Sequence, residues 1–182
     1  MIPKYCPQCG GLLDWRRLQD EQHLQPVCTR CGHVHWQNPK PTVSGLLSRQ
    51  RAPGGPVEVL LVRRALPPGE GFWDCPGGFI DLDEHPADAL RRELREELGV
   101  QAEIGPLVGI FMDRYAEDGE STLNIYYQVT AFTGTPTPAS DVGAASWCSL
   151  AQPPEPFAFE NNRRALAAFA QQIAEGDVVT KR

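Results

Sequence analysis

The stretch that decides the fold is Gly78–Val100, which reads GFIDLDEHPADALRRELREELGV. Its segment 86–98 is predicted to be a helix, because proline suits a first helical turn and Gly99 suits the position after the last turn. Three leucines recur at four-residue intervals and mark one apolar stripe: Leu90, Leu94 and Leu98. One side of this helix is therefore expected to pack against a core.

The same helix carries three glutamates, Glu93, Glu96 and Glu97, at positions i, i+3 and i+4. This spacing puts their carboxylates on one helix face, where the like charges repel one another. A cluster of hard oxygen ligands suits Mg²⁺ or Mn²⁺. Three arginines supply compensating charge: Arg91, Arg92 and Arg95. Taken without its surroundings, the helix is better explained as an ordinary solvated helix of mixed charge than as a metal site.

The surroundings favour the metal site, because the stretch resembles the signature of the Nudix hydrolase family, G-x5-E-x7-R-E-U-x-E-E-x-G-U with U aliphatic. The specified positions are all matched: Gly78, Glu84, Arg92, Glu93, Leu94, Glu96, Glu97, Gly99 and Val100. The preceding WDCPGG at 73–78 also resembles the family's lead-in. The resemblance implies an α/β/α sandwich with a mixed sheet, in which a loop–helix–loop holds the metal.

The resemblance also assigns roles to individual residues. Glu93, Glu96 and Glu97 are the expected Mg²⁺ or Mn²⁺ ligands, with the carbonyl of Gly77 as a fourth. Arg92 is expected to orient the glutamates. Gly78 and Glu84 are expected to support the loop, with the binding of a second metal as an alternative role for Glu84. The implied chemistry is attack of a metal-activated water on a diphosphate. The general base remains open among four acids: Glu96, Glu97, Glu117 and Glu120.

The N-terminal segment 1–38 contains two C-x-x-C pairs. Two such pairs close a tetrahedral site with four thiolates, and their separation falls in the zinc-ribbon range: Cys6, Cys9, Cys28 and Cys31. Such a site has no open position for water, so structural Zn²⁺ is expected. Three histidines, His23, His33 and His35, remain as spare surface or packing residues. The ribbon is expected to support folding or a dimer contact, with nucleic-acid binding as an alternative.

The remaining chain predicts one core domain over 39–176 and a flexible tail at 177–182. Short β-rich runs are expected at 42–47, 57–62, 107–115, 123–132 and 144–150. A second helix is expected from Asn162 to about Ala174, burying Leu166, Phe169 and Ile173. Cys75 and Cys148 match no metal pattern and are expected to be buried thiols.

Composition narrows the class of protein. The 182 residues carry a net charge of −6, which argues against non-specific binding to nucleic acid. No apolar run approaches the ~20 residues of a membrane span, so a cytoplasmic protein without membrane contact is expected. A dimer contact through the ribbon would make the protein a homodimer.

The combination of ribbon and signature resembles the zinc-ribbon Nudix proteins, which include the NADH pyrophosphatase group and a group acting on FAD or ADP-ribose. The resemblance implies cleavage of a dinucleotide-type substrate into two monophosphates. A triphosphate pyrophosphatase is the alternative, as is a protein acting on a nucleotide cap of RNA. Candidate substrate contacts are Arg63, Arg64, Arg114 and Tyr126, with Tyr115 and Tyr127 nearby on the predicted strands. Phe157 and Phe159 are expected to pack in the core or to stack on a base.

Overall fold

The computed structural model describes residues 3–19, 21–115 and 119–176. It divides into two compact units, and the division falls between Pro39 and Lys40. The tail expected at 177–182 lies outside the described residues. Neither described helix is long and apolar enough to cross a membrane.

The N-terminal unit is built on one antiparallel hairpin of β1 (Leu13–Arg17) and β2 (Leu24–Cys28). Each C-x-x-C pair forms a tight turn that ends in a left-handed glycine, with φ of 70° at Gly10 and 74° at Gly32. Backbone hydrogen bonds close both turns, from Gly10 to Cys6 and from Gly32 to Cys28. The glycines therefore take the backbone angles that the knuckles require.

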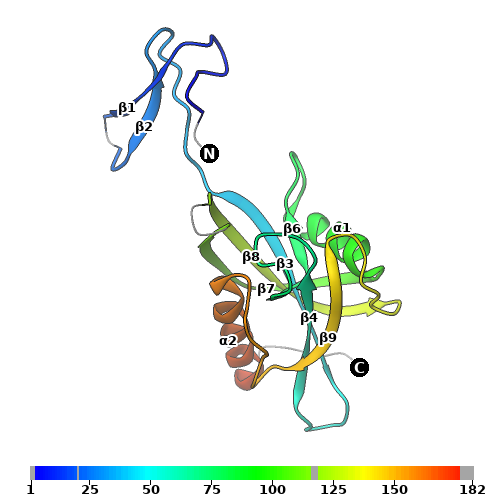
Figure 1. Ribbon diagram of the computed structural model, residues 1–182. Helices are drawn as coiled ribbons and strands as arrows, with labels where there is room; N and C mark the ends of the chain where they lie inside the picture. The colour runs from blue at the N-terminus through cyan, green and yellow to red at the C-terminus, as the bar shows by residue number, and fades with distance from the viewer. Residues whose placement is uncertain (1–2, 20, 116–118, 177–182) are drawn as a thin grey trace. The chain divides into compact units, whose positions relative to one another are not determined.

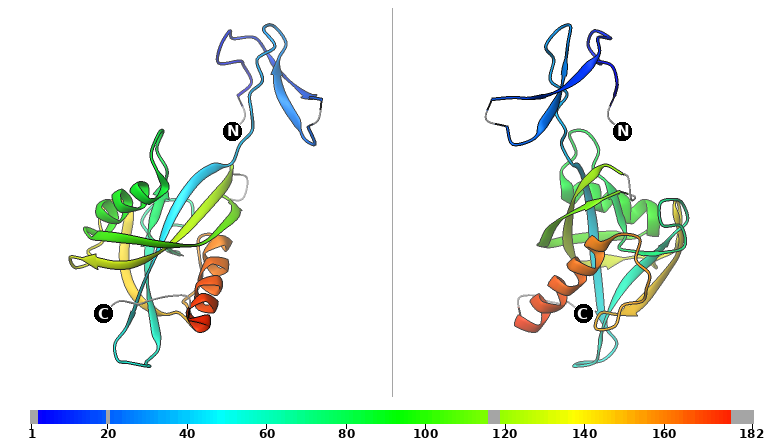
Figure 2. Two further views of the ribbon diagram at one scale, coloured as in Figure 1. Left: turned by 180° about the vertical axis from the view of Figure 1, so that it is seen from behind. Right: turned by 60° about the vertical axis from the view of Figure 1, so that its left-hand side comes forward.

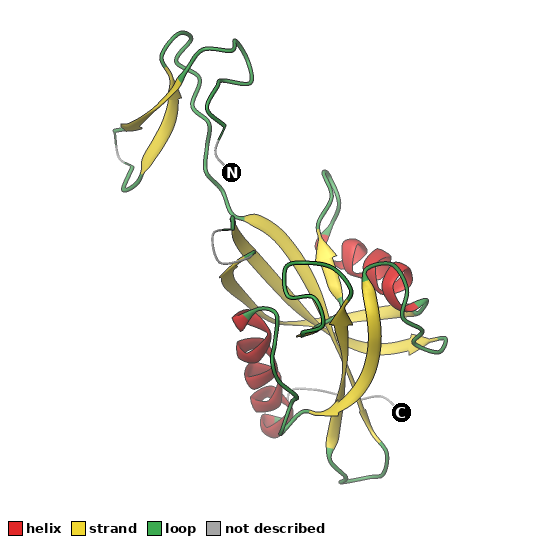
Figure 3. Cartoon of the chain, viewed as in Figure 1, coloured by secondary structure: helices red, strands yellow, loops and turns green. Residues whose placement is uncertain are grey.

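The second unit contains a seven-stranded mixed sheet (Figures 1 and 3). Its strands are β3 (Lys40–Gln50), β4 (Val57–Arg64), β5 (Trp73–Asp74), β6 (Gly77–Phe79), β7 (Gln101–Arg114), β8 (Ser121–Thr133) and β9 (Val142–Ser149). The main path is β5-β4-β3-β8-β7, while β6 pairs with β3 and β9 with β4. The β3–β8 pair is parallel and the other pairs are antiparallel. Strand β3 is therefore central, because it pairs directly with β4, β6 and β8.

Two helices cover opposite faces of this sheet (Figure 2): α1 (Pro86–Leu98) and α2 (Glu160–Glu175). Alternation along β4 divides the core, because successive side chains point to opposite faces. Val59 and Leu61 pack with Phe169 of α2. Leu60 and Val62 pack with the leucine stripe of α1. The predicted α/β/α sandwich is confirmed.

The first helix has the predicted bounds and ends. His85 precedes it and accepts a hydrogen bond from the Ala87 amide through Nδ1 at 3.2 Å. Gly99 follows it with φ 67°, and its amide donates to the Arg95 carbonyl. Leu90, Leu94 and Leu98 are fully buried. This rigid packing fixes which way the opposite, glutamate-bearing face points.

The other predicted elements form with shifted ends. The five β-rich runs lie within the five long strands, except that β7 ends at Arg114 and β9 at Ser149. The second helix begins two residues earlier than predicted, and Ile173 is only half-buried. The short strands β5 and β6 and both ribbon strands were not predicted. Cys75 is buried, whereas Cys148 is only partly buried against the core below α2.

Candidate active site

Two of the three glutamates on α1 turn inward toward strand β6. The Glu97 residue is only 5% exposed, and the Glu93 side chain is 15% exposed. The Glu96 side chain is 53% exposed and faces solvent. Glu97 Oε2 accepts a hydrogen bond from the Gly77 amide at 2.8 Å. The helix therefore presents two sheltered carboxylates and one open carboxylate along a single face.

The Gly77–Gly78 pair allows the strand to approach α1 closely. Gly77 has φ 143°, and a Cβ there would lie 2.1 Å from the Val43 carbonyl oxygen. A Cβ on Gly78 would lie 2.5 Å from Oε1 of Glu93. Any larger residue would occupy the space in which the Glu93 carboxylate lies. Gly77 is thus required by contact and by backbone angle, and Gly78 by contact.

Arg92 holds the carboxylates in place from the side. Its Nε and Nη2 bind both oxygens of Glu84, at 3.0 and 2.8 Å. Its Nη1 donates to Glu93 at 2.8 Å and to Glu96 at 3.4 Å. The hydrogen bonds with Glu84, and then that with Glu93, raise the pKa of the Arg92 guanidinium. The same contact with Arg92 lowers the pKa of Glu84. Such a bidentate fork fixes geometry more firmly than a single contact.

Burial disfavours the charged forms of the sheltered carboxylates. Burial raises the pKa of Glu97 well above its usual value; the Gly77 amide opposes this, and Asp141 and Glu93 add to it. Burial also raises the pKa of Glu93, against the effect of Arg92. A divalent cation among these oxygens would offset both the burial and the mutual repulsion. The donor set, all hard oxygen, fits Mg²⁺ or Mn²⁺.

Asp141 adds a further acid that the sequence pattern did not indicate. It lies just before β9, and it lines the same pocket as Gly77 and Gly78. Its loop is tied to the end of α1, because the Ala139 amide donates to the Glu97 carbonyl at 2.8 Å. The charge of Asp141 raises the pKa values of both Glu93 and Glu97. The three carboxylates therefore belong to one electrostatic cluster.

A pocket with a volume of about 90 Å³ opens beside these carboxylates. Three rings form one wall: Phe79, Tyr115 and Phe159. Arg64 also lines the pocket, with its guanidinium carbon 5.2 Å from the Phe159 ring centroid and 5.9 Å from that of Tyr115. Its charge is paired with partly buried Asp74 at 3.0 Å. The pocket thus combines an aromatic wall with an internally compensated ion pair.

The pocket floor is polar and fully within the fold. Tyr126 is 1% exposed, and its hydroxyl lies 2.8 Å from Oδ1 of Asn162 and 3.1 Å from Oδ1 of Asn161. Asn162 also donates to Asp74 at 2.9 Å. A second group on the floor joins β3 to β8, where Thr42 donates to Asn124 at 2.6 Å. Asp74 and the asparagines were not among the predicted site residues.

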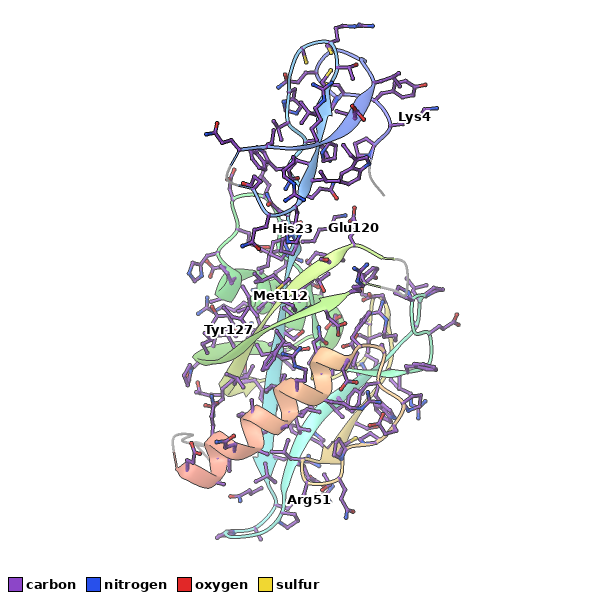
Figure 4. All side chains as sticks on the ribbon, turned by 90° about the vertical axis from the view of Figure 1, so that its left-hand side faces the viewer. Lys4, His23, Arg51, Met112, Glu120 and Tyr127 are labelled. Carbon is purple, nitrogen blue, oxygen red and sulfur yellow. The ribbon has the colours of Figure 1, made fainter. Side chains whose placement is uncertain are left out.

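The predicted substrate contacts divide between the pocket and other places. Arg64 and Tyr126 line the pocket, whereas Arg63 stacks over Trp73 and donates to the Gly71 carbonyl outside it. Arg114 is exposed and does not line this pocket. Tyr127, labelled in Figure 4, packs against the core below α1, on the face opposite Tyr126.

Other sequence candidates are placed as follows. Phe157 lies in the core, while Phe159 belongs to the pocket wall. Glu120, labelled in Figure 4, lies just before β8 and pairs with Lys40 at 2.5 Å, which lowers its pKa. It does not line the pocket. Glu117 falls outside the described residues.

The four ribbon cysteines form one cluster with all Sγ atoms within 4.8 Å of one another. The Cys9–Cys28 and Cys6–Cys31 sulfur distances are 3.5 and 3.8 Å. Tetrahedral zinc, with Zn–S near 2.3 Å, separates its sulfurs by a similar distance of about 3.8 Å. The Cys31 amide, with a smaller effect from Arg30, lowers the pKa of the Cys28 thiol to about 6. The residues therefore fit Zn²⁺.

Comparison with known families gives two matches on the chain. Residues 38–169 match the NUDIX domain, and residues 4–37 match the zinc-ribbon family described as Nudix N-terminal. The first match covers most of the chain and includes the whole candidate site. Members of the family generally use Mg²⁺ or Mn²⁺.

Several curated relatives carry pyrophosphatase names. A MutT-like protein from Streptomyces ambofaciens is 28% identical over 106 residues, which are 58% of this chain and 61% of the relative. The CTP pyrophosphohydrolase of Escherichia coli is 34% identical over 50% of this chain and 67% of its own. The ADP-ribose pyrophosphatase of Methanocaldococcus jannaschii is 23% identical over 126 residues, which are 69% of this chain and 70% of the relative.

Solved structures show the same fold. A NUDIX hydrolase from Nitrosomonas europaea superposes with a TM-score of 0.72 at 23% identity, covering 96% of this chain and 94% of its own. A MutT NUDIX hydrolase from Burkholderia pseudomallei superposes with a TM-score of 0.64 at 28% identity, covering 72% of this chain and 98% of its own. With its glutamate helix, its ribbon and these matches, the chain belongs to the Nudix family of hydrolases and carries the zinc-ribbon module of that family.

Proposed function

We propose that this hydrolase cleaves the diphosphate bond of a nucleoside diphosphate linked to another moiety, of the NADH, FAD or ADP-ribose type, into two monophosphates. The observation that carries the proposal is the adjacency of the carboxylate cluster and the aromatic pocket, which share Gly77, Gly78 and Asp141. A diphosphate at the carboxylates would place one attached group in the pocket. The Methanocaldococcus relative named for ADP-ribose supports this substrate type.

The metal site of the proposal consists of Glu93, Glu96, Glu97 and the Gly77 carbonyl, with Mg²⁺ or Mn²⁺ as the cation. Asp141 joins them as a carboxylate from a different loop. A divalent cation held there would lower the pKa of a bound water and neutralise charge on the phosphoryl oxygens. Zn²⁺ in the four-cysteine cluster has a structural role only, since no coordination position stays open.

The chain's own residues perform distinct tasks in this scheme. Arg92 orients Glu84, Glu93 and Glu96 through its fork of hydrogen bonds. The Gly77 amide holds Glu97 in the rotamer that faces the site. The proton of the attacking water is assigned to a carboxylate of this helix face, Glu96 or Glu97. Arg64 shapes the pocket wall and does not act as a free cation, since Asp74 pairs with it.

The test is a panel of NADH, FAD, ADP-ribose and nucleoside triphosphates, each with Mg²⁺ and with Mn²⁺, and with product analysis. The Glu97→Gln substitution is expected to lower kcat about 10²- to 10⁴-fold while circular dichroism stays unchanged. Glu103→Gln, an exposed change on β7, is the matched control and should retain full activity. Full activity of Glu97→Gln would refute the assignment.

A second candidate is a triphosphate pyrophosphatase, which the Escherichia coli relative named for CTP favours. Product analysis separates the two candidates. The first gives two monophosphates from a dinucleotide, and the second gives a monophosphate plus pyrophosphate from a triphosphate. Release of a nucleotide cap from RNA would extend the first candidate to a longer substrate.

A further inference from the structure

A third segment of the ribbon pairs with β2 and widens the surface of the hairpin. Val34 forms an antiparallel bridge with Val27. The His35 amide donates to the Pro26 carbonyl at 2.8 Å, and Pro26 lies opposite Trp15 in the hairpin. Directly opposed residues of antiparallel strands point to the same face. Trp15, Pro26 and His35 therefore form one row across the ribbon, and we call the face that carries this row the Trp15 face.

The Trp15 face presents exposed apolar surface without acidic side chains. Trp15 and Leu24 are each 47% exposed. Alternation along the strands gives the other side chains of this face as those of Leu13, Arg17, Cys28 and His33. Among the described residues, no aspartate or glutamate belongs to these rows. A ligand on this face would therefore meet a broad indole surface and no carboxylate.

The opposite face of the ribbon, which we call the Trp36 face, carries compensated charge. Asp14 and Arg16 lie there and form an ion pair at 3.5 Å. Alternation places Trp36 on the same side, where it is 52% exposed. On the Trp15 face, Nη1 of Arg17 donates to the Gln22 carbonyl at 3.1 Å, and no ion pair of Arg17 is found in the described part of the ribbon. The two faces thus share an exposed tryptophan but differ in unpaired positive charge.

The acidity of the chain belongs mainly to its second unit. Residues 1–39 hold four basic and three acidic residues, a net charge of +1, whereas residues 40–182 hold thirteen and twenty, a net charge of −7. Zinc thiolates would add negative charge at the Cys28 end of the Trp15 face, and Arg17 lies at the opposite end of the hairpin. The acidity that argues against nucleic-acid binding by the chain as a whole is therefore not a property of the Trp15 face.

An exposed indole beside an unpaired guanidinium suits a single-stranded nucleic acid. Trp15 and Arg17 are two residues apart on one strand face, which separates their Cα atoms by about 7 Å. Every base has a flat side that stacks on an aromatic ring, and its phosphate offers a charge to arginine. An acidic protein would pair with Arg17 but leave the indole surface unused. An apolar protein would cover Trp15 but bury Arg17 without an acceptor.

We propose that the Trp15 face of the ribbon binds single-stranded nucleic acid, with a base stacked on Trp15 and a phosphate at Arg17. Binding is expected to tolerate any base, because stacking does not depend on the hydrogen-bonding edges of the base. It is also expected to weaken as salt is added, because a phosphate contact releases counterions. The inference goes beyond the proposed function, and neither needs the other, since the diphosphate site lies in the second unit.

The test measures binding of the whole zinc-loaded chain to oligonucleotides of about twelve nucleotides, a length within the usual site sizes. The probes are a uridine RNA and a thymidine DNA with 5′-hydroxyl ends, so neither contains a diphosphate bond, together with an RNA duplex of the same length. Fluorescence anisotropy without added Mg²⁺ should show binding of at least one single strand. The duplex should bind more weakly, because its bases already stack on one another. Absence of binding to both single strands, or equal binding of the duplex, would overturn the inference.

Matched variants on the two faces locate the contact. Trp15→Ala should weaken binding by about 5- to 150-fold, the range for loss of one stacked base, whereas Trp36→Ala should leave it unchanged. Arg17→Gln should reduce the slope of log affinity against log salt by about 0.7, the value for one phosphate of a single strand. Arg16→Gln, which removes the partner of Asp14, should leave the slope as it is. Equal losses from the two tryptophan variants would contradict the proposed face.

Further measurements separate a lost contact from a lost ribbon fold. Each variant should retain the zinc content of the unchanged chain, and Trp15→Phe, which keeps an aromatic ring, should recover most of the affinity lost in Trp15→Ala. Poly-glutamate at the same charge concentration should compete poorly with the oligonucleotide. Competition as strong as that of the oligonucleotide itself would assign the face to an acidic protein and overturn the inference.

Hydrolysis assays keep the two proposals separate. Trp15→Ala should cleave small diphosphate substrates at the rate of the unchanged chain. A chain that binds single strands as described but cleaves no diphosphate would refute the proposed function alone. A chain that cleaves diphosphates but binds no single strand would refute the inference alone.

Discussion

At the scale of single residues, the site depends on carboxylates whose positions come from different parts of the chain. Glu93 and Glu97 share one helix, so their spacing alone places them on one face. Asp141 reaches them only because its loop binds the end of α1 and its carbonyl accepts from Ala65 at 2.7 Å. No local pattern indicates such a residue, which is why sequence reasoning missed it.

Replacing Asp141 by Asn is expected to lower apparent metal affinity or kcat/KM by about 10- to 100-fold, as loss of a group supporting a metal typically does. The amide keeps the shape but loses the charge. Titration of activity against Mg²⁺ measures the effect. Asp83→Asn is the control, because Asp83 is exposed with φ 62°, which asparagine also adopts. An unchanged metal titration in Asp141→Asn would remove this residue from the site.

Replacing Gly78 by Ala should displace the Glu93 carboxylate, because the new methyl group would lie 2.5 Å from its Oε1. The clash is with the end of a flexible side chain, so the fold should survive while activity falls at least tenfold. Activity and thermal unfolding, measured together, separate the two effects. Gly143→Ala, with its nearest atom at 3.7 Å, should change neither. A Gly78→Ala enzyme with normal metal dependence would show that Glu93 does not need this space.

At the scale of elements, the glutamate helix could be predicted in full and the site around it could not. The caps and the leucine stripe of α1 are local signals, and the observed helix has the predicted bounds. Strands β5 and β6 have two and three residues, and they exist through pairing with β4 and β3. Their sequences hold no strand period, so only the assembled sheet defines them.

The second helix is anchored to the sheet by a polar contact that also escaped prediction. Tyr126 reaches Asn161 and Asn162 at the start of α2 from strand β8, 35 and 36 residues away along the chain. The alternation of side chains along a strand separates Tyr126 from Tyr127, which faces the other core. It could not show which of the two would face a pair of buried amides.

Replacing Tyr126 by Phe should destabilise the protein by about 1–3 kcal/mol, because buried amides lose their partner. Urea unfolding followed by circular dichroism measures the change. Tyr127→Phe is the adjacent control, and it should cost much less, since no hydrogen bond of the Tyr127 hydroxyl is found among the described residues. Equal destabilisation by both changes would argue that ring packing, and not the hydroxyl, anchors α2.

At the scale of the whole molecule, charge and cysteine usage follow the two units. The chain has a net charge of −6, and part of that acidity is the carboxylate face of α1. Four of the six cysteines form the ribbon cluster, and the other two lie in the second unit. The C-x-x-C spacing made the cluster predictable, because each pair places two thiols on one local turn, and the two pairs together supply the four ligands of one zinc site.

The ribbon's stability should depend on its metal, because its core is small. Among the described residues of this unit, the buried apolar side chains are those of Cys6, Pro26, Val27 and Cys28, and two of them belong to the cluster. The second unit buries two clusters of its own, on either side of its sheet. Zinc binding contributes about 10–16 kcal/mol of apparent free energy in small zinc modules, so it is also the folding energy of the module.

Removal of zinc by a chelator is therefore expected to abolish amide protection in β1 and β2 while α1 and β3 keep theirs. Hydrogen exchange read by mass spectrometry measures both regions in one sample. Cys6→Ser should reproduce the effect, and Cys148→Ser, outside the cluster, should not. The physical reason is that the hairpin alone cannot bury enough surface to offset its conformational entropy. Simultaneous loss of protection in β1 and in α1 would show instead that the two units unfold as one.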